Sequence, residues 1–122
     1  MNPALQAQNA YKQNSVLSAS PEQLVLMLYD GALRFLGQAA TAMREGDVPT
    51  ANGRLRRAEA ILDELRATLD PSAGDIAERL EAIYVFCRQF LVEAQLEQDA
   101  AKIDSVAGLV GELRGAWAAI CQ

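Results

Sequence analysis

Apolar residues recur at alternating steps of three and four over residues 20–43. This spacing predicts an amphipathic helix. Ser20-Pro21-Glu22-Gln23 has the composition of a helix start, because Ser20 can act as N-cap and Gln23 can reach back to the cap. We therefore expect a helix over 21–45. Its apolar residues form two neighbouring rows: Val25, Leu28, Ala32, Phe35, Ala39 and Ala42, and Leu26, Tyr29, Leu33, Leu36 and Ala40.

The apolar arc of this helix is wider than one packing surface requires. It covers roughly two-thirds of the helical wheel, whereas a stripe of about 100° is enough for a helix that lies on one core. Two interpretations follow. The helix is either covered on most sides by its own neighbours, or it keeps apolar surface for a partner. The residues alone leave both open.

Three further helices are predicted, over 48–69, 75–97 and 100–120. Asp47 and Asp99 can cap two of the helix starts, and residues 70–74 form a break rich in turn residues. Short connections between helices favour antiparallel neighbours. The predicted fold class is therefore all-α, an antiparallel up-down four-helix bundle over 20–122 that follows an N-terminal arm over 1–19. The expected core rows are Leu55, Ala58, Leu62, Leu65 and Leu69, then Ile76, Leu80, Ile83, Cys87, Phe90 and Ala94, then Ile103, Val106, Val110, Leu113, Trp117 and Ile120.

Some residues of the later helices lie off these rows. Val85, Val92 and Leu96 align on the outer side of the third helix, where they are either the wall of a partner groove or covered by another part of the chain. The charged residues of the second helix are most simply a solvated face: Arg56, Arg57, Glu59, Asp63, Glu64 and Arg66. A glycine stripe on the last helix either permits close approach of another helix or leaves this helix labile: Gly108, Gly111 and Gly115.

Composition and charge exclude several classes of function. The 122 residues carry a net charge of −5 with no basic block, so we expect no nucleic-acid partner. Unbroken apolar runs such as 24–29 are too short to insert in a membrane, and nothing near Met1 resembles a secretory signal, so we expect a cytoplasmic protein. The chain has no histidine, and Cys87 and Cys121 lie far apart, so we expect no metal, no cofactor and no enzyme activity. Binding of another protein chain is the class of function that remains.

Four sequence runs together resemble the FliS family of flagellar export chaperones for flagellin. Each run is weak alone, but their joint occurrence in this order and at suitable separations is specific. Val85 departs from the family pattern, in which we expect an acidic or polar residue. The runs are Tyr11-Lys12-Gln13-Asn14-Ser15-Val16, Ala19-Ser20-Pro21, Leu26-Met27-Leu28-Tyr29-Asp30-Gly31-Ala32, and Leu113-Arg114 followed by Ala116-Trp117.

The resemblance implies a bundle that holds the C-terminal segment of flagellin in the cytosol, prevents premature polymerisation and presents flagellin to the flagellar export gate. A disordered, amphipathic client of this kind can fold on binding. The wide arc and the outer valines suggest the contact residues. The predicted client-binding residues are Leu26, Tyr29, Leu33, Leu36, Ile61, Val85, Val92 and Leu96.

Alternatives remain open at this point. The N-terminal arm is expected either to act as a tethered lid on the client surface or to contact the export gate, through Leu5, Tyr11, Val16 and Leu17. The competing function is a generic four-helix adaptor or regulatory bundle, or a bundle that buries its spare apolar surface by forming a dimer. The sequence does not decide whether the protein is a homo-oligomer.

Overall fold

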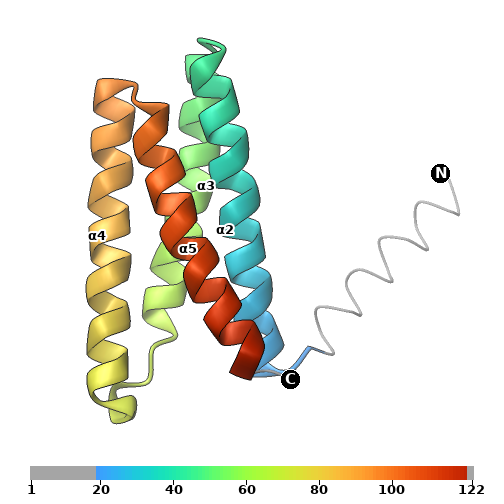
Figure 1. The fold of residues 1–122 in the computed structure, drawn as a ribbon, viewed down its shortest axis with the longest axis vertical. Coiled ribbons are helices and arrows are strands. Elements are labelled where there is room, and N and C mark those ends of the chain that lie inside the picture. Colours follow the sequence, from blue (N-terminus) through green and yellow to red (C-terminus); the bar gives the residue numbers. More distant parts are fainter. Residues whose placement is uncertain (1–18, 121–122) are drawn as a thin grey trace, which may run out of the picture.

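A computed structural model describes residues 19–120 as an antiparallel bundle of four helices (Figure 1). The helices are α2 (Pro21–Arg44), α3 (Val48–Ala67), α4 (Asp75–Glu97) and α5 (Ala100–Ile120), and a 3₁₀ turn, η1 (Pro71–Ala73), precedes α4. The predicted all-α, up-down bundle is confirmed. The segment predicted to form the arm lies, except for Ala19, outside the described residues.

Local side-chain chemistry sets the helix boundaries. The backbone N–H of Gln23 donates to Ser20 Oγ over 3.2 Å, and the Ser20 N–H donates to Gln23 Oε1 over 3.0 Å, so the predicted capping box starts α2. Gly46 follows the end of α2 with a φ of 76°, a conformation that glycine adopts without strain. Helix α3 ends at Ala67, earlier than predicted, and the Thr68 hydroxyl donates to the Leu65 carbonyl over 2.8 Å at this terminus.

Helix α2 lies between two neighbours, which explains its wide apolar arc. It packs against α3 on one side and α5 on the other, whereas α4 packs against α3 and α5 from the opposite corner (Figure 1). Leu36 and Ala39 of α2 are completely buried. The interpretation that α2 is covered by its own neighbours therefore holds for most of the arc.

The two ends of the described chain meet along α2 and α5. The guanidinium Nε of Arg114 donates to Asp30 Oδ1 over 2.8 Å, and Trp117 Nε1 donates to the Glu22 carbonyl over 2.8 Å. The last turn of α5 therefore lies beside the first turn of α2 (Figure 1). The contact between Arg114 and Asp30 joins two of the sequence runs on which the family resemblance rests.

Two residues expected in the core lie on the surface instead. Ile76 is 66% exposed and Ile120 is 71% exposed. The buried row of α4 runs through Ala77, Tyr84, Cys87, Leu91 and Ala94, so it shares Cys87 and Ala94 with the row that the sequence suggested but is displaced to one side of it. Ile120 is the last residue of α5.

The glycine stripe of α5 faces open space. A Cβ atom built on Gly108, Gly111 or Gly115 would find nothing within 4 Å apart from its own helix and chain neighbours. Within residues 19–120, therefore, no other helix makes the close approach that was one of the two interpretations of this stripe.

The thiol of Cys87 provides a test of core closure. The residue is fully buried, and burial raises the pKa of its thiol to about 11. Because the thiolate is the reactive form and the buried thiol is also shielded from the reagent, we expect Cys87 of a Cys121→Ser variant to react with a disulfide reagent at pH 8 at least about 100-fold more slowly in the native protein than in denaturant. Equal rates in a stopped-flow measurement would show that the core opens freely.

Candidate binding surface

An apolar depression of about 560 Å³ opens between the first half of α2 and the end of α3. Two large apolar side chains are partly exposed there, Leu24 at 38% and Met27 at 41%. We call this site the α2–α3 groove, and its lining residues are Pro21, Leu24, Val25, Met27, Leu28, Glu64 and Thr68.

Sequence reasoning did not select this groove, although a signal was present. Residues 24–29 form an unbroken apolar run. Six successive residues of a helix project in all directions around its axis, so such a run cannot lie wholly on one core. Leu24 and Met27 are the members that remain outside.

Ile61, a predicted client-binding residue, lies along the contact between α2 and α3. It is half-buried against the core, and its Cδ1 would be 3.2 Å from a Cβ atom built on Gly31. The missing side chain of Gly31 therefore gives Ile61 room to pack on α2. Ile61 contributes more to the contact between the helices than to an open surface.

A second apolar surface lies on α4, and we call it the α4 row: Val85, Val92 and Leu96. Val92 is 43% exposed and Leu96 is 81% exposed, so the prediction that these two lie off the core is confirmed. Val85 is half-buried and lines another depression of about 560 Å³ beside Leu69 and Phe86. Phe86 is 49% exposed and stacks on Phe90, with 5.2 Å between ring centroids.

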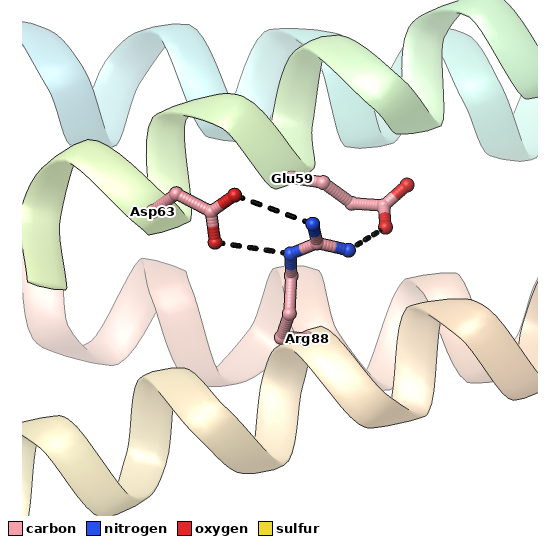
Figure 2. A network of polar contacts seen from close by, with 3 residues as sticks. All are labelled: Glu59, Asp63 and Arg88. Carbon is pink, nitrogen blue, oxygen red and sulfur yellow. Dashed lines mark hydrogen bonds and ion pairs between the residues drawn. The ribbon is translucent and has the colours of Figure 1, made fainter.

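Arg88 interrupts the α4 row with an ion-pair network that reaches α3 (Figure 2). Its Nε donates to Asp63 Oδ1 over 3.0 Å, its Nη2 donates to Asp63 Oδ2 over 3.2 Å, and its Nη1 contacts Glu59 Oε2. Because Arg88 is three residues after Val85 and four before Val92, it lies on the same side of the helix as both. The network therefore joins the two helices between the apolar parts of the row.

Glu59 differs from the rest of the charged face of α3. It is only 8% exposed, which corrects the prediction that all these charged residues form a solvated face. Burial raises the pKa of the Glu59 carboxyl, although the Arg88 guanidinium lowers it. A buried carboxylate requires a partner, and Arg88 provides it.

The structure corrects two of the predicted client-binding residues. Tyr29 is 2% exposed and Leu36 is fully buried, so both belong to the core. The hydroxyl groups of Tyr29 and Tyr84 are hydrogen-bonded over 2.6 Å inside the bundle, and burial raises the pKa of Tyr29. Both positions lie in the wide arc, but on the part that faces the other helices.

The remaining predicted residues do not form one continuous surface. Leu26 and Leu33 are half-buried on the side of α2 that carries Asp30 and faces α5. Ile61 lies between α2 and α3, and the α4 row lies on another side of the bundle. The predicted arm residues fall outside the described residues: Leu5, Tyr11, Val16 and Leu17.

Metal sites and membrane-spanning helices are both absent from residues 19–120. Over residues 19–120 there is no group of three or more His, Cys, Asp or Glu side chains placed to hold a metal ion. None of the helices in this range is long and apolar enough to cross a bilayer. The described residues do offer surfaces that can bind another polypeptide.

A closed helical bundle with apolar depressions between its helices has the form of a protein-binding module. Residues 4–122 match the family model described as flagellar protein FliS, so the chain belongs to the FliS family. It is 37% identical over 108 residues to the flagellar secretion chaperone FliS of Bacillus subtilis (strain 168), covering 88% of this chain and 80% of that protein. It is 38% identical over 107 residues to the flagellar secretion chaperone FliS of Salmonella typhimurium, covering 86% of this chain and 79% of that protein.

A solved structure shares the fold. It is described as a crystal structure of a flagellar chaperone from bacteria, and it matches with a TM-score of 0.78 and 18% identity over 98% of both chains. The resemblance seen in the sequence runs is confirmed. Since the relatives are named chaperones, a non-enzymatic role, the protein is a chaperone of this family and not an enzyme.

Proposed function

We propose that this protein is a cytosolic export chaperone for flagellin. It binds the C-terminal segment of flagellin, prevents premature polymerisation and delivers flagellin to the flagellar type III export apparatus. Its membership of a family whose relatives are named flagellar secretion chaperones supports a flagellar protein as the partner.

The observation that carries this proposal is the apolar surface that remains after the bundle has closed its core. Leu24 and Met27 stay partly exposed in the α2–α3 groove, and Val92 and Leu96 in the α4 row. The two surfaces lie on different sides of the bundle. A client that uses both must therefore be a long segment with more than one apolar stretch, and a single short helix would be insufficient.

The energetics are adequate for a client that folds on binding. Each fully buried side chain of the size of leucine contributes about 1.5–3 kcal/mol. Ordering a disordered segment costs roughly 2–5 kcal/mol or more. A few apolar anchors in each of the two surfaces are enough to offset this cost and leave a substantial net affinity.

Calorimetry with a C-terminal flagellin peptide from the same organism tests the proposal. We expect saturable binding with a negative heat-capacity change, because apolar surface leaves water. Replacing Leu24 and Met27 together by serine should weaken binding at least about tenfold, since both anchors of the groove are lost.

The matched control is Ile120→Ser, which removes an equally apolar side chain that is 71% exposed and lines neither the α2–α3 groove nor the depression beside Val85. This variant should bind like the parent protein. Absence of binding by the unaltered protein would refute the proposed function. Equal weakening by the control would show that the groove is not the contact site.

A further inference from the structure

Three exposed arginines lie beyond the apolar end of the α2–α3 groove, on the outer side of the same two helices: Arg34, Arg54 and Arg57. Arg34 on α2 and Arg54 on α3 line a shallow depression of about 670 Å³ together with Gln38 and Thr41. Arg57 is one turn further along α3 from Arg54. The two helices thus present apolar side chains at one end of their contact and guanidinium groups farther along it.

No carboxylate among residues 19–120 forms an ion pair with any of these three side chains. Arg34 lies over the ring of its neighbour Phe35, at 5.3 Å from the centroid. The arginines that do form ion pairs within the bundle are Arg44, Arg66, Arg88 and Arg114. The acids nearest in the depression are Glu45 and Asp47, and Asp47 already accepts the Thr50 N–H as the cap of α3.

The charge of the chain makes this cluster informative. Sixteen acidic residues against eleven basic ones give a net charge of −5, so acids outnumber bases in this chain, and yet Arg34 and Arg54 line one depression without an ion pair to either among the described residues. A polyphosphate would be repelled by the net charge. A guanidinium group matches the geometry of a carboxylate, which it can bind with two parallel hydrogen bonds. A peptide carboxylate beside an apolar anchor matches both parts of the surface.

The spacing along α2 defines the pattern of such a peptide. Met27 lines the apolar depression and Arg34 lines the polar one, and seven residues, or two helical turns, separate them on one side of the helix. This is about 10 Å along the helix axis. We propose that the client docks here as an amphipathic helix whose Asp or Glu side chain meets Arg34 and Arg54, about seven residues from the apolar residue that fills the groove. This inference rests on the proposed function.

Two matched charge reversals test the proposal, with the C-terminal flagellin peptide as the probe. Arg54→Glu alters the proposed contact, and Arg79→Glu makes the same change at an exposed arginine of α4 that has no ion-pair partner among the described residues. In low-salt buffer we expect Arg54→Glu to weaken binding about five- to tenfold and Arg79→Glu to change it less than about twofold. Added salt should reduce the difference.

A second experiment identifies the carboxylate of the peptide that contacts the arginines. Each Asp and Glu of the peptide is replaced in turn by Asn or Gln, and one replacement should weaken binding to the unaltered protein but strengthen binding to an Arg34→Glu/Arg54→Glu variant, in which the same carboxylate faces like charges. Circular dichroism confirms that the variants are folded. If the unaltered protein binds the peptide and both reversals bind equally well, this inference is wrong and the proposed function stands. If the unaltered protein does not bind the peptide, both this inference and the proposed function are wrong.

Discussion

Replacing Leu36 by alanine is expected to lower the free energy of unfolding by about 2–5 kcal/mol and to leave the affinity of the folded protein for its client unchanged. Leu36 is completely buried in the core cluster, so the change creates a cavity that the packed helices fill only in part. In a domain of this size the midpoint of thermal unfolding should fall by at least about 8 °C. Denaturant titration and calorimetry at a temperature where the variant is folded measure the two quantities.

Leu96→Ala is the matched control, because it removes the same atoms from a leucine that is 81% exposed. We expect it to change stability by no more than about 0.5 kcal/mol and to weaken client binding if the α4 row is part of the contact. The sequence assigned Leu36 and Leu96 to the same client surface, and the structure separates them. A Leu36→Ala variant with normal stability and lost affinity would restore the sequence-based assignment.

The elements of the fold follow from local signals in the sequence. Ser20 and Gln23 form the capping box that starts α2, Gly46 adopts the left-handed conformation after its end, and Asp47 caps α3. These interactions involve residues close in sequence, so their chemistry is visible without tertiary structure. Short connections then leave antiparallel packing as the simple arrangement.

The rotation of each helix about its axis was harder to predict. Several apolar rows were available on α2 and α4, and a row does not reveal how many neighbours will cover it. Ile76 was expected inside and is exposed, whereas Tyr84 occupies the core through its hydrogen bond to Tyr29, 55 residues earlier. Such a contact depends on how two distant helices are placed relative to each other.

The candidate surface was predicted only where apolar residues stood among polar neighbours. Val92 and Leu96 were identified in this way, because the helical wheel separates them from the core row. Leu24 and Met27 were missed because they lie in an apolar run whose other members are buried or half-buried. Periodicity identifies an apolar residue that lies on a polar face of a helix. It cannot show which residues of an apolar face remain exposed.

Replacing Arg88 by methionine is expected to lower the free energy of unfolding by about 1–3 kcal/mol near pH 7.5. The loss arises mainly from the Glu59 carboxylate, which would remain buried without its cation; the pair with Asp63, 56% exposed, adds little. The estimate is below the 3–5 kcal/mol typical of fully enclosed pairs, because the side chain of Arg88 is itself 40% exposed. Denaturant titrations at several pH values measure the effect.

The pH dependence follows from the direction of the pKa shift. Burial already raises the pKa of Glu59 in the folded protein, and loss of Arg88 raises it further. The folded state then binds more protons than the unfolded chain, so stability is retained below the unfolded pKa and falls as pH rises through the folded one. The cost of Arg88→Met should therefore be small near pH 4 and larger near pH 7.5.

A Glu59→Gln/Arg88→Met double variant should recover most of the stability at the higher pH, because no buried charge remains. A loss that is independent of pH and not recovered in the double variant would instead assign the effect to packing of the Arg88 side chain between α3 and α4.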